Sequence, residues 1–189
     1  ARHVSDLFFN ELRTGSPGEP VNENFIINYT SFETVTFSFD IKTNFLNDFI
    51  GNPIARPVGI ALKDWDTMGP SGPAGVFYEI GVIGVNFTPD WTTLTVEIDN
   101  PMSDTLPAGW IGFGDEDPST FMPILPEGVT FADVLAGVDE FAITGAVPGF
   151  FFTSALWDVQ IDNITVMLDG NPVATEDVSW GSVKAMYQN

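Results

Sequence analysis

The sequence predicts an all-β fold, an antiparallel β-sandwich with a jelly-roll-like arrangement of strands. Apolar residues recur at every second position in many short runs, whereas helical spacing is almost missing. Clusters of Gly, Pro, Asn and Asp separate these runs, as turns separate strands. The 189 residues, 44% of them apolar, suit one domain with a large core, and no apolar run is long enough for a membrane helix.

Three runs show the alternation most clearly, and we expect each to bury one face against the core. They are "VTFSFDI" (35–41), "PVGIALKDW" (57–65) and "WTTLTVEID" (91–99). Further strands are predicted in "DLFFNEL", "NFIINY", "VFYEIGVIG", "GWIGFG", "DEFAITG" and "GFFFTS". The segment "DWDTMGPSGPAG" (64–75) is rich in Gly and Pro, so we interpret it as a long surface loop.

Two short segments are predicted to be helical. The first, "TFADVLAG", has Thr130 three residues before Asp133, a variant of the capping box, and ends on Gly137. The second, "EDVSWGSVKAMYQN", spans residues 176–189 and spaces its apolar residues as a helix does. We therefore expect a sandwich domain over residues 1–175, followed by a helical tail that packs on the domain or on a neighbouring molecule.

The run "LWDVQIDNITVML" (Leu156–Leu168) alternates, but its phase changes at Asp162 and Asn163. The alternating apolar residues are odd-numbered before this point, at Trp157, Val159 and Ile161, and even-numbered after it, at Ile164, Val166 and Leu168. One extra residue in a strand is the signature of a β-bulge. We predict a bulge that leaves Asp158, Gln160 and Asp162 on the outer face and returns the later apolar residues to the core.

Charge and composition exclude several classes of function. With 26 acidic and 6 basic residues the formal charge is −20, which is unsuited to nucleic acid or to an anionic membrane surface. The chain has no cysteine, and its single histidine is His3. Catalytic triads, thiolate chemistry and histidine-rich zinc sites are therefore disfavoured. Paired carboxylates able to hydrolyse polysaccharide arise by chance among so many acids, so we predict a protein without enzymatic activity.

Three acidic clusters are candidate Ca²⁺ sites, because hard cations prefer carboxylate, amide and carbonyl oxygens in irregular segments. They lie in "KDWDT", in "FGDEDPST" and in "WDVQIDN". The candidate ligands are Asp64, Asp66, Asp115, Asp117, Asp158, Asp162 and Asn163. None of the clusters matches an EF-hand loop, and the alternative is that each is a solvated acidic segment.

Aromatic residues make up 13% of the chain, and two tryptophans are candidates for stacking on sugar rings. Trp65 lies in an acidic segment predicted to be a loop, and Trp110 begins a predicted strand. The alternative is a place in the core, which we expect for most of the aromatic residues.

The order of motifs in the C-terminal half resembles a known group of proteins. The motifs are "DWTTLTVEI", "LPAGWIGF", "VTFADVLAGVDEFAITG" and "VPGFFFTSALWDVQIDNITV", over roughly residues 90–168. Together they resemble secreted bacterial proteins that carry PEP-CTERM-type sorting tails, and laminin IV-type domains have a comparable ending. The resemblance implies an extracellular jelly-roll sandwich that binds glycans or builds matrix. The sequence departs from it at "SWGSVKAMYQN", where the group has a linker and an anchor.

These observations predict a secreted structural subunit of a filament, sheath or matrix, stabilised by Ca²⁺ and formed by self-association. A start at "ARHVS" without Met is what removal of a signal peptide leaves, so we expect an extracellular or cell-surface location. A carbohydrate-binding or adhesion module is the alternative, and a polysaccharide hydrolase is the second alternative. Neither nucleic-acid binding nor membrane insertion is expected.

Overall fold

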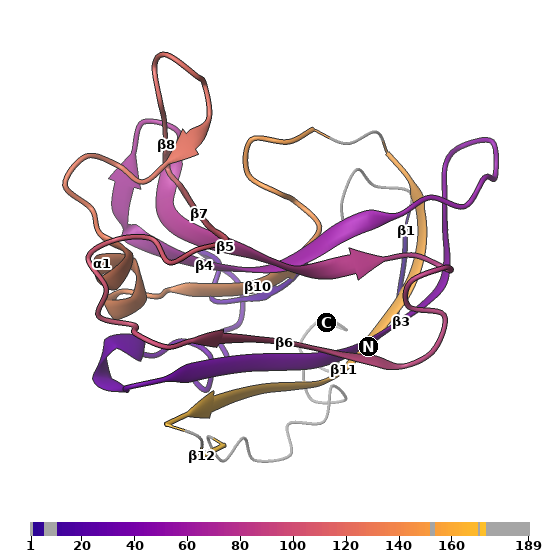
Figure 1. The fold of residues 1–189 in the computed structure, drawn as a ribbon, viewed down its shortest axis with the longest axis horizontal. Helices are drawn as coiled ribbons and strands as arrows, with labels where there is room; N and C mark the ends of the chain where they lie inside the picture. Colours follow the sequence, from indigo (N-terminus) through magenta and orange to yellow (C-terminus); the bar gives the residue numbers. More distant parts are fainter. Residues whose placement is uncertain (1, 6–10, 152–153, 170, 173–189) are drawn as a thin grey trace.

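The computed structural model describes residues 2–5, 11–151, 154–169 and 171–172, which form two packed antiparallel sheets (Figure 1). Sheet A has the order β1 (Arg2–Ser5), β11 (Leu156–Leu168), β3 (Val35–Asn47) and β6 (Thr92–Ile98), with β12 (Asn171–Pro172) on β11. Sheet B has the order β2 (Glu11–Thr14), β10 (Glu140–Thr144), β4 (Arg56–Gly69), β5 (Gly72–Ile83) and β7 (Trp110–Phe113). A small third sheet joins β8 (Asp115–Glu116) to β9 (Pro123–Ile124).

The strand order is that of a jelly roll. The first strands of the chain pair with its last ones, β1 with β11 and β2 with β10, while β3 and β4 take the next places in sheets A and B. The chain crosses between the sheets after β1, β2 and β3, and β7 extends the edge of sheet B. The predicted all-β, jelly-roll-like sandwich is confirmed.

The core lies between the sheets and is built from the alternating residues that the sequence indicates. Phe37 of β3 and Ile60 of β4 are buried in the same cluster as Val96 of β6. Phe141 of β10 stacks between Phe25 and Phe37, with ring centroids 4.9 Å and 5.6 Å away. The three clearest strand predictions are therefore confirmed, and aromatic stacking joins the two layers.

The predicted strand "NFIINY" is wrong. Residues 23–27 form turns, and a short 3₁₀ helix follows, η1 (Tyr29–Ser31). The amide oxygens of Asn22 and Asn28 accept hydrogen bonds from the backbone N–H groups two residues later, at Asn24 and Thr30. This local turn chemistry prevails over the apolar run, although Tyr29 is still buried in the core.

The predicted loop at residues 64–75 is also wrong, because β4 continues to Gly69 and β5 starts at Gly72. Gly75 allows strands to pack closely here and does not mark a loop, because a Cβ atom on Gly75 would lie 2.2 Å from Cζ of Phe113. Of the predicted strand "GFFFTS", residues 149–151 are a turn and irregular chain instead. In "DLFFNEL", residues 6–10 lie outside the described part of the chain, and the last two residues begin β2.

Helix α1 (Phe131–Ala136) confirms the predicted short internal helix. Its N-cap Thr130 and Asp133 form the expected capping box, and Gly137 is the C-cap. The buried side chains of Phe131 and Leu135 belong to the core, so α1 closes one end of the sandwich (Figure 1). The predicted C-terminal helix and the boundary at residue 175 lie outside the described residues. Within the described residues, no helix has the length and apolarity needed to cross a membrane.

The predicted bulge in β11 is confirmed. Asp162 pairs with Asp40 and Thr165 with Ser38, so Asn163 and Ile164 together face a single residue of β3. Asn163 adopts φ 49°, in the left-handed region. The six alternating apolar residues of β11, on both sides of the bulge, contact the core as the phase change predicts: Trp157, Val159, Ile161, Ile164, Val166 and Leu168.

Candidate functional site

The outer face of sheet B carries an open pocket of about 270 Å³. Its floor comes from residues of β4, β5 and β7 that point away from the core, namely Ala61, Phe77 and Phe113. These residues belong to a second small apolar cluster, separate from the main core, that also contains Ala142 and Val147. Sheet B therefore has apolar side chains on both faces, which is unusual for an antiparallel sheet with one solvated face.

The walls of the pocket mix polar and apolar groups. Polar side chains come from β2, β4, the β4–β5 turn, β8 and β10, and the apolar part of the wall is rich in proline and glycine. The polar residues are Glu11, Lys63, Ser71, Asp115, Glu116 and Thr144. The remaining wall residues are Gly114, Pro123, Ala146, Pro148 and Gly149. Flat apolar surface flanked by hydroxyl and carboxylate groups suits a small organic ligand.

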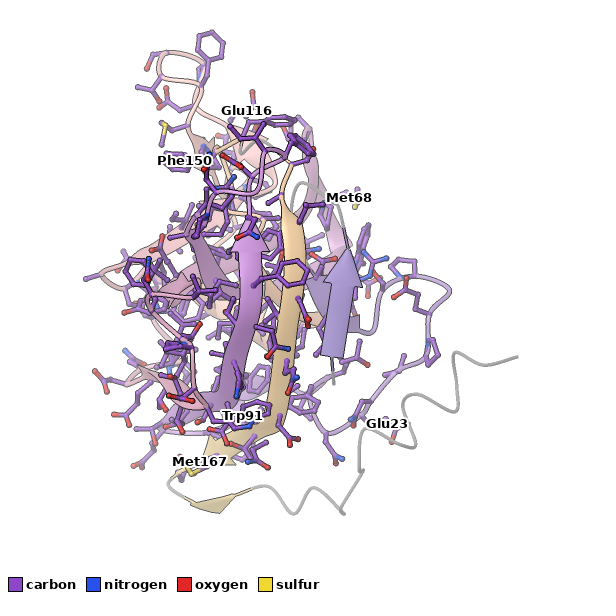
Figure 2. All side chains as sticks on the ribbon, turned by 90° about the vertical axis from the view of Figure 1, so that its right-hand side faces the viewer. Glu23, Met68, Trp91, Glu116, Phe150 and Met167 are labelled. Carbon is purple, nitrogen blue, oxygen red and sulfur yellow. The ribbon has the colours of Figure 1, made fainter. Side chains whose placement is uncertain are left out.

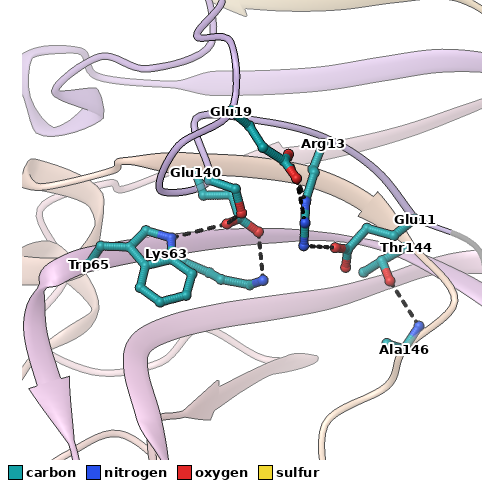
Figure 3. Close-up of polar contacts among 9 residues, drawn as sticks. Glu11, Arg13, Glu19, Lys63, Trp65, Glu140, Thr144 and Ala146 are labelled. Carbon is teal, nitrogen blue, oxygen red and sulfur yellow. Dashed lines mark hydrogen bonds and ion pairs between the residues drawn. The ribbon is translucent and has the colours of Figure 1, made fainter. Parts of the chain in front are cut away.

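One side of the pocket is fixed by a buried polar network (Figure 3). Glu140 faces Lys63 directly across the β10–β4 pair, and its side chain is 0% exposed. Oε1 of Glu140 accepts a hydrogen bond from Lys63 Nζ at 2.6 Å, while Oε2 accepts one from Trp65 Nε1 at 3.0 Å and one from Ser16 Oγ. Burial raises the pKa of Glu140, but the hydrogen bonds from Lys63, Ser16 and Trp65 outweigh burial and hold that pKa below its ordinary value.

A second ion-pair group lies on the neighbouring edge strand β2 (Figure 3). The Arg13 guanidinium donates to Glu19 at 2.6 Å and 3.0 Å, and to Glu11 at 3.0 Å. The hydrogen bond from Arg13 lowers the pKa of Glu19. The positive charges of Lys63 and Arg13 are therefore both taken up by carboxylates of the protein itself.

Large apolar side chains are exposed around the pocket, at the end of the molecule where Figure 2 labels Met68, Glu116 and Phe150. Phe121 is 74% exposed in the β8–β9 hairpin, and Phe150 and Phe151 are 59% and 91% exposed. We call this set the apolar end: Met68, Phe121, Met122, Ile124, Phe150 and Phe151. The turn at Gly149 lies against Pro123 of β9, which places Phe150 beside the hairpin.

The two predicted sugar-stacking residues do not form an exposed platform. Trp110 is 7% exposed and packs on Tyr78 and Phe131 in the core, so its assignment to sugar binding is wrong. It is the first residue of β7 and points inward, because the alternation of that strand turns Ile111 and Phe113 to the outer face. Trp65 is half-buried, lies in β4 rather than in a loop, and uses its indole N–H on Glu140.

The candidate metal ligands stay in three separate places, and several have structural partners. Oδ1 of Asp64 accepts hydrogen bonds from the backbone N–H groups of Asp66 and Thr67, where the register of β4 shifts, and Asp64 is buried. Hydrogen bonds from Ser119 and Thr120 lower the pKa of Asp117 to about 2. These carboxylates stabilise local turns.

Asp158 is not on the outer solvent-facing row that the sequence predicts, because it is 4% exposed. A second register shift between β11 and β3 leaves Asn44 unpaired opposite Asp158, and Asn44 Nδ2 donates to Asp158 Oδ1 at 3.0 Å. Asp162 and Asn163 are exposed, and Asn163 Nδ2 donates to Asp40 Oδ2 at 2.6 Å. The side chains of Asp158 and Asn163 therefore bond to different partners and do not converge on one point.

Asp115, which pairs with Ile124 in the small β8–β9 sheet, is the one candidate ligand in the pocket wall. Among the described residues, no three His, Cys, Asp or Glu side chains are close enough together to hold a metal ion. Ca²⁺ binding stays a prediction.

Sequence reasoning missed Lys63, Glu140 and the two phenylalanines of the pocket floor. A signal for the floor exists in "VFYEIGVIG", whose apolar residues fall on both phases of the strand. A weaker signal for the ion pair is Lys63 itself, a basic residue within the alternating run 57–65 of a chain that has 26 acidic residues. That Lys63 meets Glu140 depends on the pairing of β4 with β10, which the sequence alone does not specify.

The chain matches no protein-family model, and no curated protein or solved structure matches it either. The resemblance of residues 90–168 to secreted sorting-tail proteins therefore stays a prediction.

Proposed function

We propose that the protein is a non-enzymatic structural subunit that self-associates outside the cell. The observation that carries this proposal is the apolar end, where phenylalanine and methionine side chains gather around the β8–β9 hairpin. Water-exposed apolar surface of this kind is unfavourable, and on soluble proteins a cluster of it marks an interaction site.

The shape of the apolar end favours contact with a second molecule. The β8–β9 hairpin projects beyond the two main sheets (Figure 1). Phe121 belongs to the loop that joins its two strands. A projecting arm with an aromatic side chain suits insertion into a neighbouring subunit, because buried aromatic anchors supply much of the binding energy of interfaces.

Charge sets a condition on such an assembly. At −20 per chain, closely packed subunits repel one another unless cations or neutralised carboxylates intervene. We include Ca²⁺ in the proposal as the bridging cation, supported by the exposed carboxylates of Asp66, Glu116 and Asp162. Export by a cleaved signal peptide is part of the same proposal, supported by the resemblance to secreted proteins.

Sedimentation velocity and negative-stain electron microscopy test the assembly. We expect the weight-average mass to rise with protein concentration in Ca²⁺, and to fall towards that of the monomer in EDTA. Monomers at high concentration under both conditions would contradict the proposal. Assembly that is unaffected by EDTA would remove Ca²⁺ from it and leave self-association standing.

The pocket on sheet B favours carbohydrate binding as a second candidate function. Its apolar floor and its hydroxyl and carboxylate walls are the groups that sugar rings contact. A glycan array probed with the protein is the test, followed by the Glu116→Gln variant on each positive glycan. An array without hits would contradict this candidate, and so would hits that do not respond to any change in the pocket.

A further inference from the structure

The balance of charge in the sheet B pocket indicates which class of glycan it takes. Among the described residues, Lys63 is the only basic one that lines it, and its ammonium group is bound to the enclosed Glu140. Asp115 and Glu116 bring two carboxylates to the lining, and neither has a cationic partner among the lining residues that the structure describes. The pocket therefore repels anions and attracts cations.

The rest of the lining indicates an organic ligand rather than a bare ion. Phe113 and Pro123 offer apolar surface below and beside the carboxylates, and a hydrated metal ion would gain nothing from either. Ser71 supplies a hydroxyl group, and so does Thr144, whose Oγ1 accepts a hydrogen bond from the backbone N–H of Ala146. A hydroxyl group can still donate its proton when its oxygen accepts a bond.

We propose that this pocket binds an amino-sugar unit of a cationic glycan, a proposal that rests on the second candidate function. The sugar ring lies on the apolar floor, its hydroxyl groups meet Ser71 and Thr144, and its ammonium group lies at Asp115 and Glu116. Electrostatic complementarity then separates amino sugars from neutral and acidic sugars, because an acidic sugar would approach two unneutralised carboxylates.

Isothermal titration calorimetry with a glucosamine tetramer tests the proposal, at about pH 6 so that the amines are protonated. The N-acetylated tetramer of the same length is the neutral control ligand, and tetralysine is the control for charge without a sugar. We expect the glucosamine tetramer to bind with the highest affinity of the three. NMR chemical-shift changes are expected to centre on residues 113–116 and on Thr144.

Two matched variants locate the effect. Glu116→Gln removes one carboxylate from the pocket wall and is expected to weaken binding of the glucosamine tetramer about fivefold, the size of one partly exposed ion pair. Glu97→Gln makes the same change of charge on the outer face of sheet A and is expected to leave the affinity unchanged. Equal losses in the two variants would show unspecific attraction to an acidic protein and overturn the proposal.

The other outcomes separate this inference from the function on which it rests. Equal binding of the N-acetylated tetramer at the pocket overturns the cationic preference and leaves glycan binding intact. Equal binding of tetralysine overturns the role of the sugar ring. Absence of binding by both tetramers overturns the inference, and the glycan array then decides the second candidate function independently.

Discussion

Glu140 is a carboxylate placed on the outer face of a strand and yet fully enclosed by its neighbours. Replacing it by Gln keeps the shape but leaves Lys63 without its counter-charge in a half-buried position. We expect Glu140→Gln to lower the free energy of unfolding by about 3 kcal/mol, since removal of one partner from a buried ion pair is costly. Urea denaturation at neutral pH measures it, with Glu97→Gln as the exposed control. Equal stability of the two variants would contradict the enclosed network.

The pH dependence of that loss has a defined sign. Because the pKa of Glu140 is lowered in the folded protein, its contribution is complete above the pKa of an unfolded glutamate, about 4.3, and is lost as pH falls through the folded value. The difference in unfolding free energy between wild type and Glu140→Gln is therefore expected to be constant above about pH 5.5 and to shrink below about pH 4. A difference that grows on acidification would mean that burial, and not the ion pair, sets the pKa.

The bulge in β11 is the clearest test among the elements. Asn163 holds a left-handed backbone conformation, which a β-branched residue adopts only at a cost of about 1–2 kcal/mol. Asn163→Val is expected to destabilise the protein by at least this amount, and Asn163→Gly by clearly less, because glycine loses only the side-chain hydrogen bond to Asp40. Thermal melts of the two variants measure the difference. Equal melting temperatures would contradict the bulge geometry.

The capping box gives a second prediction for an element. Thr130 Oγ1 accepts the backbone N–H of Asp133 at 3.1 Å, and Asp133 Oδ2 accepts the backbone N–H of Thr130 at 2.9 Å. Thr130→Ala is expected to cost about 1 kcal/mol of stability, the usual value of an N-cap. In a double-mutant cycle with Asp133→Ala, the second substitution should then cost little, because the two bonds form one motif. Additive losses would show that the bonds act independently.

For the whole molecule, the apolar end is the feature on which the proposed self-association depends. Phe121→Ser removes an exposed aromatic ring from the projecting hairpin, so we expect weaker self-association at unchanged monomer stability. Phe49→Ser is the matched control, since Phe49 is 65% exposed but lies in the β3–β4 connection. Sedimentation velocity over a concentration series compares the variants. Equal assembly of Phe121→Ser and wild type would place the interface elsewhere.

The sequence predicts those parts of the molecule that depend on local pattern. Alternation identifies β3, β4, β6 and β11, and a change of phase identifies the bulge at Asn163. Cap chemistry likewise identifies α1. Predicting these features requires only the period of a strand or the residue spacing of a helix cap, and both are local properties of the sequence.

The parts that the sequence does not predict depend on which strands meet. The Lys63–Glu140 pair and the second shift at Asn44 both follow from register between distant segments. The apolar pocket floor arises because β5 and β7 bring Phe77 and Phe113 to the same outer face. Trp110 and Trp65 differ in burial for the same reason, since the face on which an aromatic side chain lies is set by the sheet and not by its own segment.

The pairing of β3 with β11 constrains the order in which the chain can fold. Val35 pairs with Leu168, so β3 has its neighbour β6 early but lacks its partner β11 until residues 156–168 have been synthesised. Closing so long a loop costs conformational entropy before the contacts between β3 and β11 can stabilise it. Because of this cost, sandwiches with such distant strand pairings fold slowly, in roughly milliseconds to seconds. A nascent chain that ends before residue 156 has no β11 and cannot complete either β1 or β3. Ribosome-bound fragments should therefore remain protease-sensitive until Leu168 has emerged, and a fragment that resists protease before that point would show that sheet A can form without β11.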